Sequence, residues 1–170
     1  MKILNISDEL IQFSTYVDQI DLSFNQFLLL GSAPLLVHTG SSVIMQDLIE
    51  QIKLILKGRE IEYLFISHFE SDECGGIGLL LKNYPNLKIL CSEVTSRELS
   101  GFGITNKTTV LKHGAVINSD SHQFEFIGYP SEVHLWDGLL LFERNSSTLF
   151  SSDLFLKFGK ISEVVGTDNW

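Results

Sequence analysis

The stretch ISHFESDECGG, residues 66–76, follows the apolar run EYLFI at 62–66 and gathers three side chains able to bind a metal or move a proton. His68, Glu70 and Asp72 stand on alternate positions. If the loop stays extended, alternate positions point their side chains to the same side. The apolar run has the length and composition of a buried strand. We therefore expect a cluster of ligand-type groups where a core strand ends.

This loop has two interpretations. One imidazole and two carboxylates form a mixed, hard ligand set, which suits Fe(II) or Mn(II) and tolerates Zn(II). In the other interpretation, Asp72 only caps a helix that begins near Cys74. Gly75 and Gly76 allow a sharp turn into a helix in either case. The loop alone does not decide between a metal site and a capped helix.

The rest of the chain predicts an α/β fold in which helices cover sheets. Apolar residues recur at helical spacing in the first expected helix, where Ser41 or Ser42 can cap the start and Gly58 can end it; Ser92 can cap the third. The expected helices span 41–58, 76–84 and 92–101. The expected strands span 2–6, 12–20, 25–31, 34–40, 62–66, 87–91, 108–112, 122–129, 138–144 and 147–152. The quoted stretch thus leaves the carboxyl end of a strand, where open α/β sheets usually hold their sites.

Composition narrows the class of protein. The 170 residues are 44% hydrophobic and 19% charged, which is typical of a folded chain, and we expect one domain over 1–170. The net charge of −9 argues against nucleic acid and against an anionic membrane surface as partners. No apolar run approaches the ~18 residues of a membrane span. With only Cys74 and Cys91 and no signal-peptide pattern, we expect a reduced, cytoplasmic protein.

Two more ligand-type residues lie in the second half of the chain. His134 stands just before the expected strand 138–144, and Asp153 just after the strand 147–152. If these strands pair as a hairpin around 145–146, His134 and Asp153 lie at the same end of it. The hairpin would then hold an imidazole and a carboxylate together.

These residues carry a family resemblance. HFESD at 68–72, then His134, then SSDLF at 151–155 resemble the metal-site motifs of the metallo-β-lactamase superfamily. The pattern H-x-E-x-D, a distant His and a later Asp is closest to the flavodiiron and oxygen-binding di-iron branch. The order, the spacings and the strand contexts are all similar, over about residues 1–160.

The resemblance implies an αββα sandwich, here C-terminally short, with a two-metal site at one edge. It implies that His68, Glu70 and His134 bind one metal, that Asp72 binds the other, and that Asp153 bridges both. The implied cofactors are two iron ions, the second more weakly held, with zinc or manganese as alternatives.

The sequence also departs from the family pattern. Hydrolytic members usually read H-x-H-x-D-H, whereas Glu70 replaces the second His and Glu73 the last. No His follows His134, where the family has a further ligand, and a flavodoxin-like domain is absent from the sequence. The turn at 38–40 reads His-Thr-Gly where Asp-Thr-Gly is usual. The carboxylate at position 70 favours iron over a di-zinc hydrolase.

Three functions follow from these observations. The first is a non-haem di-iron protein that binds, senses or reduces O₂ or NO, with a separate electron donor if it is redox-active. The second is a metal-dependent hydrolase of the same fold, and the third is a non-catalytic remnant acting as an interaction module. Because the domain is short of its usual final strand and helix, we expect exposed apolar surface and a homodimer. Whether the protein is an enzyme stays open, and no catalytic residue is assigned.

Five other polar residues have less clear roles. His38 ends an apolar strand near the expected site, and we interpret it as structural. Glu73 either replaces the missing nitrogen ligand or faces water, and we expect water. Asp137 either orients an imidazole or lies in a solvated turn. His113 and His122 lie in polar turns or strand edges and are expected to have no role at the site.

Overall fold

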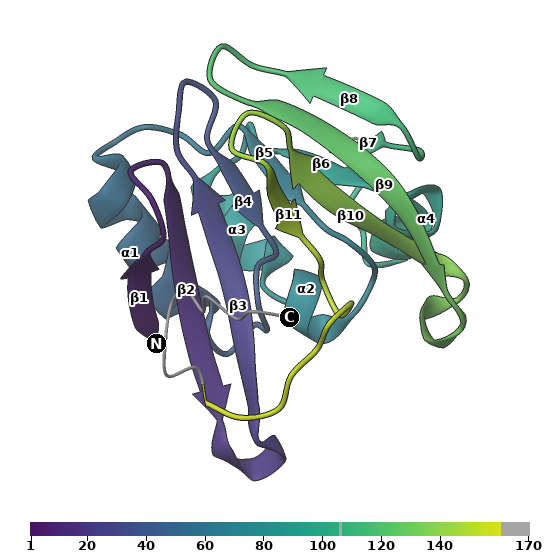
Figure 1. Ribbon diagram of the computed structural model, residues 1–170, viewed down its shortest axis with the longest axis horizontal. Helices are drawn as coiled ribbons and strands as arrows, with labels where there is room; N and C mark the ends of the chain where they lie inside the picture. Colours follow the sequence, from purple (N-terminus) through teal and green to yellow (C-terminus); the bar gives the residue numbers. More distant parts are fainter. Residues whose placement is uncertain (106, 161–170) are drawn as a thin grey trace.

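A computed structural model describes residues 1–105 and 107–160, which form two β-sheets that face each other, with helices outside (Figure 1). The strands are β1 (Lys2–Asn5), β2 (Leu10–Val17), β3 (Leu22–Leu29), β4 (Leu35–Val37), β5 (Tyr63–Phe65), β6 (Lys88–Cys91), β7 (Thr108–Val110), β8 (Ala115–Asn118), β9 (Gln123–Ser131), β10 (Asp137–Glu143) and β11 (Thr148–Phe150). The helices are α1 (Met45–Leu56), α2 (Ser71–Cys74), α3 (Ile77–Asn83) and α4 (Glu93–Gly101), with 3₁₀ turns η1 (Asp18–Ile20) and η2 (Glu132–His134).

The larger sheet has the order β1-β2-β3-β4-β5-β6-β7. Its first four strands are antiparallel and connected by short turns, whereas β4, β5, β6 and β7 are parallel. Parallel neighbours need crossover connections, which α1, α2 with α3, and α4 supply. The segments that leave β4 and β5 therefore begin at the same edge of the sheet.

The smaller sheet is antiparallel throughout, in the order β11-β10-β9-β8. In it, β10 and β11 form the hairpin that the sequence predicts around residues 145–146. The backbone N–H of Leu139 in β10 donates to the carbonyl of Ser67, which follows β5, at 2.9 Å. This hydrogen bond joins the two sheets beside the expected metal site.

The core has two layers. Leu36 of β4 and Leu64 of β5 pack with α1, α3 and α4 on the outer face of the larger sheet. Their neighbours Val37 and Phe65 point the other way and pack against Phe126 and other residues of the smaller sheet. Strands buried on both faces read as continuous apolar runs, which is why 35–37 and 63–66 lack polar alternation. The facing sheets and outer helices confirm the expected sandwich.

Several element boundaries differ from the sequence prediction. The strand expected at 12–20 ends at Val17, because η1 turns the chain toward β3. The first helix begins at Met45 and has no side-chain cap, so the prediction that Ser41 or Ser42 caps it is wrong. Strand β8 was not predicted. The cap of α4 is confirmed, since the backbone N–H of Thr95 donates to the hydroxyl of Ser92 at 3.0 Å.

The largest local difference lies in the motif loop itself. Glu70 has an extended backbone, but residues 71–74 form the short helix α2. The prediction of an extended loop with alternating side chains is therefore correct only up to Glu70. Asp72 lies inside α2 rather than at its N-cap, so the capping interpretation is also wrong. No helix in the described ranges is long and apolar enough to cross a membrane.

Candidate metal centre

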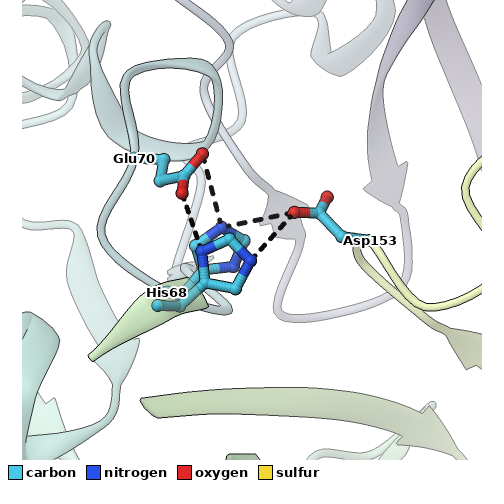
Figure 2. A group of neighbouring side chains, drawn as sticks. His68, Glu70 and Asp153 are labelled. Atoms are coloured by element: carbon cyan, nitrogen blue, oxygen red, sulfur yellow. Dashed lines mark ion pairs between the residues drawn. The ribbon is translucent and has the colours of Figure 1, made fainter. Parts of the chain in front are cut away.

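Four of the five candidate ligands meet at one edge of the sandwich. His68 and Glu70 follow β5, His134 lies in η2 between β9 and β10, and Asp153 follows β11. Figure 2 shows His68, Glu70 and Asp153 pointing toward one another. Each sheet thus contributes one imidazole and one carboxylate, and the pairing of β10 with β11 brings the second pair to the first.

Within the described part of the chain, one group of side chains offers ligand atoms that all lie within 4.8 Å of one another: His68, Glu70, His134 and Asp153. His68 Nε2 lies 4.0 Å from Glu70 Oε2 and 3.6 Å from Asp153 Oδ2. His134 Nε2 lies 3.4 Å from the same Asp153 oxygen, and His134 Nδ1 lies 2.7 Å from Glu70 Oε1. The two imidazole rings are 4.0 Å apart between centroids.

The distances of 3.4–4.0 Å fit a shared cation, whereas the 2.7 Å distance involves the other ring nitrogen of His134. Ligands held about 2.0–2.2 Å from one ion lie about 3.0–4.2 Å from each other in tetrahedral or octahedral geometry. His68 Nε2 is buried without a hydrogen-bond partner. His134 Nδ1 also lacks one, because its 2.7 Å approach to Glu70 is not aligned as a hydrogen bond. Buried polar atoms in native proteins are normally satisfied, and two unpaired nitrogens facing carboxylates fit the ligand set of a cation.

Two hydroxyls orient the imidazole of His68. The Ser67 hydroxyl lies 3.0 Å from His68 Nδ1, and it also lies 2.8 Å from the hydroxyl of Ser152. Ser152 is 3.4 Å from the same ring nitrogen. An outer hydrogen bond at one imidazole nitrogen fixes the ring and leaves the other free to bind a metal. The sequence motif gave no signal for Ser67 or Ser152.

A second group of ligand atoms lies next to the first. Glu70, Asp72 and Glu73 offer carboxylate oxygens that all lie within 4.8 Å of one another. Glu73 is only 4% exposed, and its Oε2 lies 3.6 Å from His68 Nε2 without a hydrogen-bond partner. The expectation that Glu73 faces water is therefore wrong, because the helical turn α2 directs it into the site. Glu70 is the residue that belongs to both groups.

Burial controls the protonation of this region. It raises the pKa of Glu73 to about 9, with the negative charge of Asp72 acting in the same direction. Burial, and then the charge of Asp72, also raise the pKa of Asp153. The pKa of His68 is lowered by burial and by His134. Each pKa shift favours the neutral form of its side chain. Charged side chains are therefore unfavourable in this site unless a bound cation compensates the negative charge.

His38 lies on the same side of the molecule. It lines a cleft of about 730 Å³ together with Asp72, Glu73 and Asp153. Its ring stacks on Phe65, with centroids 6.3 Å apart, and its Nε2 is buried without a partner. Burial lowers the pKa of His38 to about 3. It belongs to neither group of ligand atoms, so the structural interpretation of His38 stays a prediction.

Asp137 neither hydrogen-bonds to an imidazole nor lies in a solvated turn in the described structure, which differs from both interpretations of the sequence. Its Oδ2 accepts hydrogen bonds from the hydroxyl of Ser92, the N-cap of α4, and from the hydroxyl of Thr95 within α4. It therefore ties the smaller sheet to α4, and the described hydrogen bonds do not link it to an imidazole. His113 accepts from the backbone N–H of Gly128, at 3.1 Å.

The sequence matches the family model described as ODP family beta lactamase over residues 22–168. A relative from Nostoc sp., named as a diflavin flavoprotein, is 29% identical over 135 residues, which cover 78% of this chain and 23% of that protein. An anaerobic nitric oxide reductase flavorubredoxin from Vibrio vulnificus is 24% identical over 136 residues, covering 78% of this chain and 27% of that one. The chain thus spans about a quarter of the length of these relatives.

The fold is similar to solved structures. A flavo di-iron protein variant from Thermotoga maritima superposes with a TM-score of 0.85 and 21% identity, over 98% of this chain and 45% of that chain. At this identity the likeness concerns the fold alone. The two facing sheets of this chain thus match the fold of part of that structure.

Proposed function

The chain belongs to the ODP beta lactamase family, on the flavodiiron branch of the metallo-β-lactamase superfamily, and we propose that it is a non-haem di-iron protein that binds, senses or reduces O₂ or NO. The observation that carries the proposal is the group formed by His68, Glu70, His134 and Asp153, with two unpaired imidazole nitrogens between carboxylates. Two bound iron ions would supply the redox chemistry of the diatomic molecule.

The candidate residues would have different roles in binding such a centre. His68 and His134 supply nitrogen, and the hydroxyl of Ser67 holds the His68 ring in place. Asp153 lies within 3.6 Å of both imidazoles, in a position to share its carboxylate. The side chains of Glu70 and Asp153 are 43% and 39% exposed, whereas that of His68 is 4% exposed. The part of the site formed by Glu70 and Asp153 is therefore open to solvent, and a small molecule would reach the centre from this side.

Glu70 separates this proposal from hydrolysis. The hydrolase pattern has a neutral imidazole at this position, whereas Glu70 brings a negative charge. That charge weakens the cation as a Lewis acid and makes metal-bound water less acidic. Carboxylates instead suit the hard, oxidised state that follows electron transfer.

The direct test is metal analysis of protein produced in iron-supplemented medium, followed by absorption spectra before and after exposure to air. The Fe(II)-loaded protein should react with O₂ or NO and should hydrolyse carboxylic and phosphate esters poorly. Glu70→His, which recreates the hydrolase triplet, should shift metal preference from iron toward zinc. Zinc in the purified protein, ester hydrolysis, and an Fe(II) form inert to both gases would instead establish the hydrolase alternative. No bound metal at all would leave the interaction-module alternative.

We also propose a homodimer, with a separate protein supplying electrons. Large apolar side chains are exposed around the site, in η2, directly after η2 and after β11: Val133, Leu135, Trp136, Phe155 and Phe158. Exposed apolar surface of this kind is typical of contact surfaces. Sedimentation velocity should show a dimer at micromolar concentration. A monomer at high concentration would contradict the dimer and leave the metal proposal intact.

A further inference from the structure

Glu73 stands where the related pattern has an imidazole, and its environment is unusual for a carboxylate. Its side chain is 5% exposed, and Oε2 has no hydrogen-bond partner. That oxygen faces His68 Nε2 at 3.6 Å, so it is aimed into the centre rather than toward solvent. A buried carboxylate without a partner destabilises a fold by several kcal/mol unless a proton or a cation accompanies it.

The backbone around Glu73 fixes this orientation. Its carbonyl accepts hydrogen bonds from the backbone N–H of Thr39 at 2.7 Å and from the Thr39 hydroxyl at 3.2 Å. The same hydroxyl accepts from the N–H of Gly76. At Gly76 a Cβ would lie 2.6 Å from the sulfur of Met45, so only glycine permits this close approach of α1. These contacts hold the backbone of the turn on both sides and so fix the direction in which the side chain of Glu73 leaves it.

The imidazole of His68 faces one oxygen of Glu73, and the other ligand-type neighbours of Glu73 are carboxylates. Glu70, Asp72 and Glu73 each offer a carboxylate oxygen within 4.8 Å of the others. The neighbouring group contains two imidazoles, and Glu70 belongs to both groups. The site is thus asymmetric, with one position that combines nitrogen and oxygen and one that has oxygen alone.

We propose that Glu73 is a metal ligand and that, with Glu70 and Asp72, it forms an oxygen-only second position selective for hard divalent cations such as Mn(II). Replacing a neutral imidazole by a carboxylate shifts relative preference from Zn(II) toward Mn(II), because oxygen anions favour harder ions. The second position would take Fe(II) or Mn(II) more readily than Zn(II), and Mn(II) serves as its probe when iron already occupies the position beside His68 and His134. This inference rests on the proposed function for the first position only.

The test is a Mn(II) titration followed by electron paramagnetic resonance, on protein that already holds one equivalent of Fe(II) under anaerobic conditions. The wild type should bind one further Mn(II). Glu73→Gln keeps the shape and removes the anionic oxygen, and it should weaken Mn(II) binding at least about tenfold while leaving the first Fe(II) within about threefold. Glu60→Gln, at the opposite end of β5, is the matched control and should change neither affinity.

Glu73→His provides the complementary variant. It should lower the ratio of Mn(II) to Zn(II) affinity at the second position at least about tenfold relative to the wild type. Circular dichroism melts of the metal-free variants check folding. If Glu73→Gln does not fold, Asp72→Asn removes another oxygen of the same position and should weaken Mn(II) in the same way.

The outcomes separate the two proposals. An unchanged Mn(II) affinity in folded Glu73→Gln, or an unchanged metal ratio in Glu73→His, overturns the inference and leaves the first position standing. Failure of wild-type protein to bind even the first Fe(II) overturns the proposed function. Loss of Mn(II) in Glu73→Gln with retained Fe(II) supports both.

Discussion

Two regions of the molecule bury a histidine beside a glutamate, and they differ in whether these side chains have hydrogen-bond partners. His122 and Glu143 are 5% and 0% exposed, and His68 and Glu73 are 3% and 4% exposed. Glu143 accepts hydrogen bonds from three backbone N–H groups and one hydroxyl, and His122 Nε2 pairs with a backbone carbonyl. Near His68, the facing nitrogen and oxygen have no partner. Burial alone is therefore not informative, whereas unpaired buried atoms that lie within a group of ligand-type side chains, as here, fit a metal site.

The hydrogen bonds set the charge of each glutamate. Burial at Glu143 acts to raise the pKa, but the bonds from Ser146, Gln123 and Asn145 outweigh it, and the pKa is lowered. At Glu73 no such bonds oppose burial, and the pKa rises to about 9. Hydrogen bonds therefore stabilise the charged form of Glu143, whereas burial favours the neutral form of Glu73 unless a cation binds it.

The largest expected effect is on stability, from removal of the satisfied carboxylate. Glu143→Ala leaves the N–H groups of Gln123, Asn145 and Ser146 without their acceptor, and it should lower the free energy of unfolding by about 3 kcal/mol. Urea denaturation of the metal-free protein measures this. The control Glu125→Ala removes a carboxylate whose salt bridge is with Arg144, and it should cost less than about 1 kcal/mol. An equal loss of unfolding free energy in the two variants would show that the hydrogen bonds of Glu143 do not stabilise the fold more than an exposed ion pair does.

Removing an unpaired imidazole should act on metal binding instead. His134→Ala deletes a nitrogen ligand and should weaken the first Fe(II) by at least about 100-fold, which equals about 2.7 kcal/mol. Anaerobic isothermal titration calorimetry gives the affinity. His113→Ala is the matched control, because its imidazole accepts from the backbone N–H of Gly128 and belongs to neither group of ligand atoms. An affinity for iron that survives in His134→Ala would show that the unpaired nitrogen is not a ligand atom.

His38 sharpens the comparison because it is buried and unpaired, yet outside both ligand groups. Burial lowers its pKa from 6.5 to about 3. Below pH 6.5 the unfolded chain takes up a proton that the folded protein refuses until about pH 3, so this group's contribution to stability is lost as pH falls. The full slope is about 1.4 kcal/mol per pH unit, which amounts to about 2 kcal/mol from pH 6.5 to 5.

The variant His38→Asn removes this titration, and asparagine tolerates the left-handed backbone at φ +62°. Urea denaturation at several pH values should give a shallower acid loss in the variant than in the wild type, with metal affinity within about threefold. Parallel pH profiles would contradict the buried neutral imidazole. A large loss of metal affinity would place His38 in the centre after all.

The smallest expected effect comes from the outer hydrogen bond. Ser67→Ala removes the hydroxyl that holds His68 Nδ1 and should weaken metal binding about tenfold without a comparable loss of stability. Competition with a chromophoric chelator measures this. Ser96→Ala, which removes a hydroxyl pair with Thr108, is the control and should leave affinity unchanged. If both serine variants bind metal as the wild type does, the ring orientation of His68 does not depend on Ser67.

Much of the fold follows from the sequence because it depends on long patterns. The helical spacing of apolar residues in α1 and the apolar runs of β4 and β5 extend over enough positions to be recognised. The meeting of His68, His134 and Asp153 was predictable too, since each stands at the end of a strand and the β10–β11 hairpin brings two of them to one side.

The rest of the site depends on features too short to carry a pattern. Helix α2 has four residues, about one turn, and this turn decides whether Glu73 faces water or the centre. The partners of Asp137 and His68 are hydroxyls of serine and threonine, common residue types whose roles arise only when distant segments pack together. Short helices and side-chain hydrogen bonds across the fold therefore escape sequence analysis.

The central claim is that the side chains of His68, Glu70, His134 and Asp153 bind iron. Crystals of the protein grown anaerobically with Fe(II) allow anomalous diffraction to be recorded on both sides of the iron absorption edge. The account predicts an iron peak about 2.0–2.2 Å from His68 Nε2 and from a carboxylate oxygen of Glu70 or Asp153. An iron peak elsewhere, or no iron peak with these side chains well ordered, would contradict it.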